Sequence, residues 1–110
     1  MTDEKRAYPR ISFVEQVSLI TPEEKKYASQ SEDLSLSGMY LIKDDPFPPE
    51  TRGLLSMIIR DGDAKKTIGC QFRVVHNQPA SNGAAGMGIE FLNLDDEGAI
   101  AILKLLEQES

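Results

Sequence analysis

The sequence has few of the residues that redox, metal or membrane chemistry requires. It contains one cysteine, Cys70, which cannot close an intramolecular disulfide, and one histidine, His76, so the two cannot make up a zinc site. Its apolar runs span only a few residues, far below the roughly 20 needed to cross a bilayer. The N-terminal residues are charged and lack the apolar core of a signal peptide. We therefore expect a cytoplasmic protein without membrane insertion or a bound metal.

An excess of positive charge is also missing. The 110 residues include 12 lysines and arginines against 18 aspartates and glutamates, a net charge of -6. Proteins that bind long nucleic acids gain most of their affinity from many cationic contacts, so a nucleic-acid polymer is not the expected partner. A small anionic ligand needs only two or three well-placed cations, and Lys5, Arg6 and Arg10 lie close together.

The hydrophobicity pattern predicts a mostly β protein of a single domain. Hydrophobic residues make up 40% of the chain and charged residues 27%, as in soluble globular proteins. Apolar residues alternate with polar ones in several segments, and Asp61-Gly62-Asp63 is the best hairpin signal. Three prolines make 44–49 a surface loop, and residues 76–79 are predicted to break a strand. Strands are expected over residues 11–20, 27–31, 39–42, 54–60, 68–74 and 87–91.

Only the C-terminal segment has a helical pattern. Asp95 or Asn93 can cap a helix over about 95–108, whose apolar residues Ala99, Ile102, Leu103 and Leu106 fall at helical spacing. Five to seven short strands followed by one helix indicate an all-β fold with a C-terminal helix, either a small barrel or a sandwich. The helix can cover its own barrel or a second subunit, which leaves monomer and homodimer open. We expect an N-terminal arginine arm over 1–10 and the folded domain over 11–110.

Catalytic and cofactor sites find little support. Cys70 and His76 are too far apart along a strand to act as nucleophile and base, and His76 is interpreted as a solvated loop residue. The glycine-rich segment 83–88 precedes a strand, whereas a dinucleotide-binding loop opens a helix. Asp44-Asp45 and Asp95-Asp96 lack the oxygen donors of a calcium loop. The sequence therefore predicts neither an enzyme nor a resident cofactor.

Five residues remain as a candidate binding site for a small guanine nucleotide: Arg6, Arg10, Asp33, Ser35 and Gly38. The guanidinium groups of Arg6 and Arg10 match phosphate oxygens and the edge of guanine. Asp33 can accept hydrogen bonds from guanine or hold an arginine in place, and Ser35 adds a donor of short reach. Gly38 permits a close backbone approach. The alternative is a frayed terminus and an ordinary turn.

These residues resemble the two-part signature of the PilZ domain family. The R-x-x-x-R motif runs from Arg6 to Arg10 and the D-x-S-x-x-G motif from Asp33 to Gly38. The resemblance covers nearly the whole chain and implies a six-stranded antiparallel β-barrel with a C-terminal helix. It also implies binding of the bacterial second messenger cyclic di-GMP, with Arg6 and Arg10 on phosphates and guanine edges and with Asp33 and Ser35 on guanine.

Three further residues are candidate contacts, namely Lys5, Ser37 and Gly88. Many family members have arginine at the position of Lys5 and glycine at that of Ser37. Because lysine lacks the planar fork that stacks on a base, the number of bound ligands is left open.

The resemblance thus implies a receptor whose arm becomes ordered around cyclic di-GMP and which then presents a surface to a downstream protein partner. The alternative is a PilZ-like adaptor that binds proteins without nucleotide. The residues do not distinguish among motility, polysaccharide export and adhesion as the process served.

Overall fold

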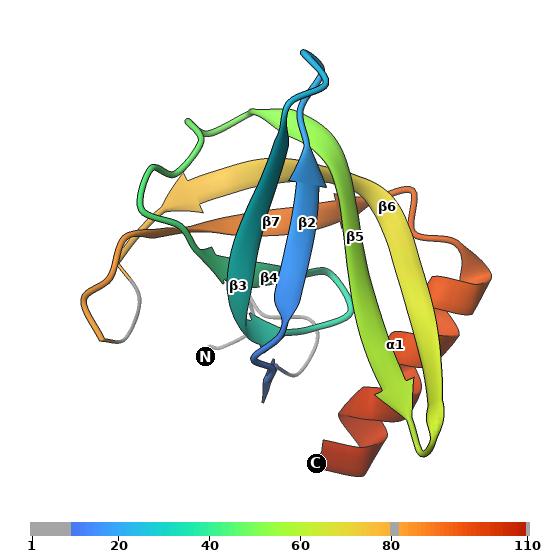
Figure 1. Ribbon diagram of the computed structural model, residues 1–110. Coiled ribbons are helices and arrows are strands. Elements are labelled where there is room, and N and C mark those ends of the chain that lie inside the picture. Colours follow the sequence, from blue (N-terminus) through green and yellow to red (C-terminus); the bar gives the residue numbers. More distant parts are fainter. Residues whose placement is uncertain (1–9, 80–81, 110) are drawn as a thin grey trace, which may run out of the picture.

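The structure, a computed structural model, describes residues 10–79 and 82–109. These residues form seven strands and one helix, coloured along the chain in Figure 1. The elements are β1 (Ile11–Ser12), β2 (Gln16–Ile20), β3 (Lys26–Leu34), β4 (Gly38–Ile42), β5 (Arg52–Asp61), β6 (Ala64–Asn77), β7 (Gly86–Leu92) and α1 (Asp96–Glu109).

Strands β2 to β7 form a closed antiparallel barrel. The order of neighbouring strands is β1-β3-β2-β5-β6-β7-β4, and pairing of β3 with β4 closes the ring. The short β1 adds to β3 through the pairs Ile11↔Leu34 and Ser12↔Asp33. The six-stranded antiparallel barrel with a C-terminal helix expected from the sequence is therefore confirmed. Closure leaves β3 and β4 side by side at the point where the candidate site residues lie.

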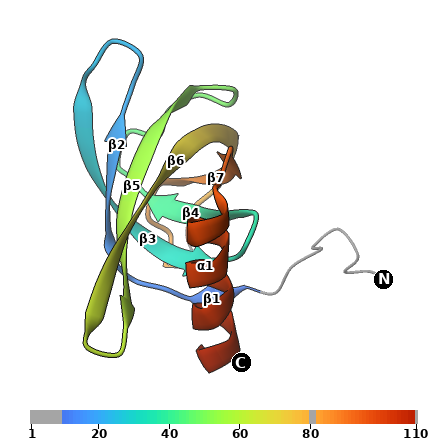
Figure 2. The same ribbon diagram turned by 90° about the vertical axis from the view of Figure 1, so that its right-hand side faces the viewer.

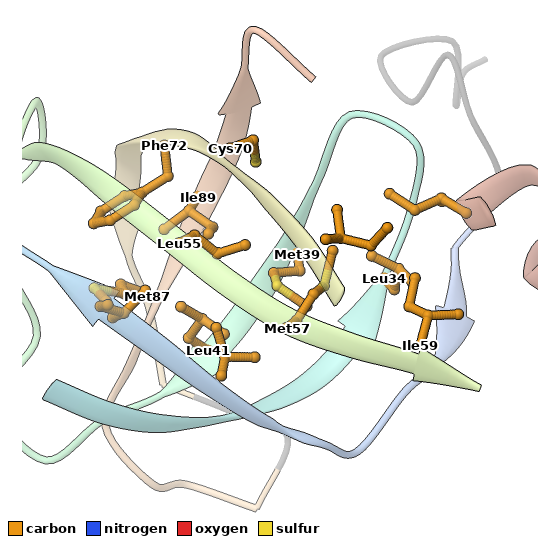
Figure 3. Packing of buried hydrophobic residues seen from close by; sticks show 14 of the residues in the cluster. Leu34, Met39, Leu41, Leu55, Met57, Ile59, Cys70, Phe72, Met87 and Ile89 are labelled. Carbon is orange, nitrogen blue, oxygen red and sulfur yellow. The ribbon is translucent and has the colours of Figure 1, made fainter. Parts of the chain in front are cut away.

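Alternation along the strands builds the core. In β6, for example, the inward residues Ile68, Cys70, Phe72 and Val74 are all buried. Side chains from facing strands meet inside the barrel in the same way (Figure 3). Burial of such side chains stabilises the fold by roughly 1.5–3 kcal/mol each relative to exposure. The buried cluster consists of Val17, Leu19, Leu34, Met39, Leu41, Leu55, Met57, Ile59, Ile68, Cys70, Phe72, Val74, Met87, Ile89, Ile102 and Leu106.

The hairpin of β5 and β6 extends beyond the rest of the barrel. The register pairs Asp61 with Ala64, so Gly62 and Asp63 form the two-residue turn, and Gly62 has a φ of 64° that suits glycine. Pairing of β2 with β5 ends at Val17↔Met57, so the ribbon continues past the end of β2 (Figure 1). The hairpin predicted at Asp61-Gly62-Asp63 is confirmed.

The continuous strand predicted over residues 11–20 is wrong. It is divided into β1 and β2 by residues 13–15, where Val14 is 57% exposed. The buried Ser31 causes the division, because its hydroxyl donates to the Phe13 carbonyl at 2.5 Å and accepts from the Glu15 amide at 3.0 Å. Backbone bonds to β3 persist here, from the Phe13 amide to the Glu32 carbonyl and from the Ser31 amide to the Glu15 carbonyl. The Ser31 hydroxyl adds to them and holds the chain where it turns from β1 into β2.

The interpretation of His76 as a loop residue is also wrong. Strand β6 continues through Asn77, and His76 pairs with Gly88 of β7 after a register shift at Val74/His76. The imidazole remains exposed on the outside of the barrel.

Helix α1 packs against the barrel of its own chain, beside β5 and β6 (Figure 2). The Asp95 carboxylate accepts a hydrogen bond from the Gly98 amide at 2.7 Å, so Asp95 is the residue that caps the helix. Ile102 and Leu106 are buried as predicted, whereas Leu103, expected on the same stripe, is 44% exposed. Among the described residues, no helical segment combines the length and apolar character needed to span a bilayer.

Candidate functional site

Arg10 and Asp33 are brought together by the pairing of β1 with β3. Arg10 directly precedes β1, and the pair Ser12↔Asp33 places the end of β3 beside it. The Arg10 Nη1 atom lies 2.9 Å from Asp33 Oδ1, and the two side chains are 28% and 30% exposed. The pair is therefore accessible to solvent, which leaves the remaining donors of the guanidinium within reach of an external anion.

A β-bulge directs the Asp33 side chain outward. The register of β3 with β4 shifts between Ser31 and Asp33, so Glu32 is the additional residue on β3. Such bulges re-aim side chains and are common beside functional sites. Asp33 Oδ1 also accepts a hydrogen bond from the Tyr40 amide at 2.9 Å. Asp33 thus fixes the bulge and holds Arg10 with the same oxygen.

Ser35 stabilises the turn between β3 and β4. Its amide donates to the Gly38 carbonyl at 2.9 Å, and its hydroxyl accepts from the Ser37 amide at 3.2 Å. The residue is fully buried, whereas Ser37 is exposed. In this conformation the Ser35 hydroxyl serves the turn, and Ser37 presents the accessible hydroxyl.

Gly38 allows β4 to lie close to β7. A Cβ atom at this position would lie 2.1 Å from the Ile89 carbonyl oxygen, a distance at which one of the two backbones must move. The close approach expected for this glycine therefore occurs between two strands of the barrel. The requirement for glycine at the end of the D-x-S-x-x-G motif follows from barrel packing alone.

A row of residues on the outside of the barrel continues from Asp33. The pairs Asp33↔Tyr40, Tyr40↔Gly88 and Gly88↔His76 cross β3, β4, β7 and β6 in turn. A Cβ atom at Gly88 would lie 2.5 Å from the His76 ring, so the imidazole covers this glycine. Sequence analysis missed Tyr40 and His76 because register shifts, which no local pattern reveals, align them with Asp33.

The carboxylates near this row make its surroundings electronegative. Partial burial, and then the charges of Glu32 and Asp33, raise the pKa of the Tyr40 hydroxyl above its usual value. The phenol therefore remains protonated at neutral pH and donates to the Gln78 carbonyl. A hollow of about 640 Å³ farther along β3 is lined by the carboxylates Glu15, Asp44 and Asp45 against one cation, Lys43, and this balance disfavours an anionic ligand there. Binding of an anion near Asp33 depends on cations supplied by arginines.

Arg73 is already engaged by two carboxylates on the barrel. Its Nε atom lies 2.7 Å from Glu90 Oε2, and its Nη1 atom lies 2.7 Å from Glu50 Oε2. Arg10 has the Asp33 carboxylate as its acidic partner. Lys5 and Arg6, the other predicted cationic contacts, lie outside the described residues.

The PilZ domain family model matches residues 4–108. The chain therefore belongs to the PilZ domain family, and the resemblance drawn from its two motifs is confirmed. No curated protein sequence matches it.

Solved structures with this fold come from several bacteria. The inhibitor of motility MotI/DgrA from Bacillus subtilis is 17% identical, with a TM-score of 0.83 over 98% of this chain and 55% of that chain. The PilZ domain of YcgR from Escherichia coli, solved with c-di-GMP, is 13% identical, with a TM-score of 0.71 over 96% of this chain and 92% of that chain. The MrkH–c-di-GMP complex of K. pneumonia is 14% identical, with a TM-score of 0.69 over 94% and 51%, respectively. This chain thus spans about half the length of MotI/DgrA and MrkH.

Proposed function

We propose that this protein is a receptor for cyclic di-GMP and binds it without chemical conversion. The observation that carries the proposal is the ion pair of Arg10 with Asp33, which joins the two family motifs at 2.9 Å on an accessible surface. YcgR and MrkH, both solved with c-di-GMP, support this choice of ligand.

Arg10 and Arg6 supply the positive charge in this proposal. Cyclic di-GMP carries two phosphates, and a guanidinium group binds phosphate through two parallel hydrogen bonds. Asp33 holds Arg10 Nη1 and leaves the other N–H groups of the fork for the ligand. Arg6 closes over the ligand from the other side, with Lys5 as a further cationic contact. The exposed Ser37 offers a hydroxyl to the ligand. Contact with Gly88 requires that the His76 imidazole, which covers this glycine, turn aside.

Binding orders the N-terminal arm and so produces the output. Fixing one residue of backbone costs about 1–2 kcal/mol, which charge-assisted hydrogen bonds of roughly 1.5–3 kcal/mol each must offset. Several such hydrogen bonds are therefore needed to hold the arm. The ordered arm then forms a new surface for a downstream protein partner.

Calorimetric titration of the full chain with cyclic di-GMP tests the proposal. We expect the wild-type protein to release heat and Arg10→Ala to lose it, because the arm can no longer join the D-x-S-x-x-G segment. Arg52→Ala is the matched control. It also removes one arginine, whose side chain is exposed at the start of β5. Circular dichroism of each variant verifies that the barrel is intact.

A nucleotide-free adaptor is the competing function. It is favoured by one observation, namely that Ser35 and Gly38 are both required by the turn and by strand packing even without a ligand. A folded wild-type protein that gives no heat with cyclic di-GMP at high concentration would overturn the receptor and favour the adaptor.

A further inference from the structure

The projecting end of the β5–β6 hairpin and helix α1 together enclose a groove rich in positive charge. The groove is lined by Arg60, Lys65 and Lys66 from the hairpin and by Lys104 from the helix. The chain as a whole has a net charge of -6, so these four cations are concentrated against the overall balance. We call this feature, with its apolar floor described below, the cationic groove.

The strand register sets like charges against each other. Arg60 lies directly opposite Lys65, and Lys66 follows on the same strand opposite Ile59. Like charges at directly opposed positions of an antiparallel pair are destabilising. Asp63 in the turn is also exposed and offsets part of this charge. Because side chains alternate along a strand, Arg60 and Lys65 lie on the opposite face of the ribbon from Ile59 and Lys66. The cations thus stand on both faces of the ribbon at the rim, and an anionic partner that crosses this rim would relieve the repulsion.

The floor and one wall of the groove are apolar. Ile59, Ala101 and Leu105 line the interior, and Ile100, which is 52% exposed, stands at its edge. The enclosed volume is about 230 Å³. Pockets for drug-sized ligands are ~300–1,000 Å³, so this space suits a protruding side chain better than a free small molecule.

We propose that the cationic groove is a docking site for an acidic segment of another protein that inserts an apolar side chain between the hairpin and α1. In Figure 1 the hairpin extends past the barrel, with α1 alongside it. Carboxylates of the segment pair with the rim cations, which provides specificity and a fast association rate. The apolar side chain contacts Ile100 and the floor. This docking does not depend on the proposed binding of cyclic di-GMP.

Three other occupants fit less well. A two-fold dimer through this face would place each set of cations against its own copy, because such an interface uses the same patch on both subunits. Long nucleic acids require many phosphate contacts along a basic surface. A flat anionic membrane could meet the cations at the rim but would insert no side chain between the hairpin and α1.

The test uses a fluorescein-labelled synthetic peptide of alternating glutamate and leucine, titrated with the full chain. Fluorescence anisotropy is expected to show binding, whereas a peptide with lysine in place of glutamate, or serine in place of leucine, is not expected to bind. Lys65→Glu together with Lys66→Glu should weaken binding by about tenfold or more, because attraction at the rim becomes repulsion. Ile100→Ser should weaken it without a change in charge.

The matched control is Lys25→Glu with Lys26→Glu, which makes the same charge change on two exposed lysines next to the β2–β3 turn. This variant should bind the peptide within about twofold of wild type, because screening limits the effect of distant charges. Equal losses in both double variants would overturn the proposal, as would equal binding of the lysine peptide or no binding of the glutamate peptide. A preference for phosphatidylserine vesicles or single-stranded DNA over the peptide, or dimerisation in sedimentation through this face, would also overturn it.

Discussion

Packing of the barrel requires glycine at the end of the D-x-S-x-x-G motif, whether or not a ligand binds. Gly38 faces the Ile89 carbonyl of the neighbouring strand, and there is no space for a Cβ atom between them. Gly69 on β6 is also a strand glycine, but there a Cβ atom would lie 3.7 Å from the Leu55 carbonyl, an ordinary contact. Two glycines in similar secondary structure therefore differ in their tolerance of a methyl group.

We predict that Gly38→Ala lowers the free energy of unfolding by about 1–3 kcal/mol or more, the range for overpacking a dense interior. Gly69→Ala should leave it unchanged or raise it, because glycine inside a strand costs roughly 0.5–1 kcal/mol relative to alanine. Urea unfolding of both variants measures the difference. Equal midpoints for the two alanine variants would show that β4 and β7 separate easily. That result would contradict the close approach of Gly38 to the Ile89 carbonyl.

Cys70 is predicted to react slowly with alkylating reagents at neutral pH. Its burial, and secondarily the charge of Asp95, raises the pKa of the thiol from 9.0 to about 11. Because the thiolate is the reactive form, alkylation by iodoacetamide should accelerate only as the pH approaches that value. Asp95→Asn, which keeps an oxygen to cap the helix, should lower the pKa.

The same shift affects stability in the alkaline range. Between pH 9.0 and about 11 the folded protein retains a proton that the unfolded chain has lost, so the free energy of unfolding falls as the pH rises. The difference in this slope between wild type and Cys70→Ala isolates the contribution of the thiol. Identical slopes would mean that Cys70 titrates at its ordinary pKa in the folded state.

Among the strands, the break between β1 and β2 shows how a single hydroxyl overrides a local pattern. Residues 11–20 alternate in polarity as one strand would, yet the Phe13 carbonyl and the Glu15 amide both bond to the Ser31 hydroxyl. Ser31 is distant in sequence and fully buried. By turning the chain here, it sets the course of β1, and β1 in turn positions Arg10 beside Asp33.

We predict that Ser31→Ala destabilises the protein by about 1–3 kcal/mol, because buried backbone groups lose their partner. Amide hydrogen exchange of Glu15, whose N–H donates to the Ser31 hydroxyl, should accelerate, while exchange in the β5–β6 ladder stays slow. Ser29→Ala is the matched control, since the Ser29 hydroxyl makes one bond, to the Ile42 carbonyl at 2.8 Å. Unchanged exchange at Glu15 would contradict the role assigned to Ser31.

The strands and the helix that follow local rules were predicted well. Apolar runs located the cores of β4 and β5, and alternation located those of β6 and β7. The Asp-Gly-Asp turn located the hairpin, and Asp95, one of two candidate caps, is the residue that caps α1. The errors lie where distant parts of the chain meet. The register shifts at Asp33 and His76 depend on strand pairing, so no local pattern indicated that Tyr40 and His76 share a row with the site. The proximity of Arg10 to Asp33 was expected from the paired motifs, whereas their role in ligand binding stays a prediction.

The molecule as a whole separates two surfaces of opposite character. The candidate nucleotide site lies where β1, β3 and β4 meet, and Arg10 is paired there with the carboxylate of Asp33. The cationic groove lies at the projecting end of β5 and β6 beside α1. The closed barrel between them has a dense core with few ways to deform. Each surface is therefore expected to respond to its own substitutions, and charge reversal at Lys65 and Lys66 should leave cyclic di-GMP binding intact.

Stability of the entire fold provides the broadest test of the proposed function. A ligand that binds only the folded state at 100 times its dissociation constant stabilises it by about 2.7 kcal/mol. Since 1 kcal/mol shifts the melting temperature of a small domain by about 4–8 °C, cyclic di-GMP should raise it by on the order of 10 °C.

Added salt should reduce this rise, because the Arg10 and Asp33 side chains are partly exposed and their interactions are screened. Thermal unfolding followed by circular dichroism measures both effects, with Arg52→Ala expected to behave as wild type and Arg10→Ala to show no rise. A full rise in Arg10→Ala would place the nucleotide away from the Arg10–Asp33 pair.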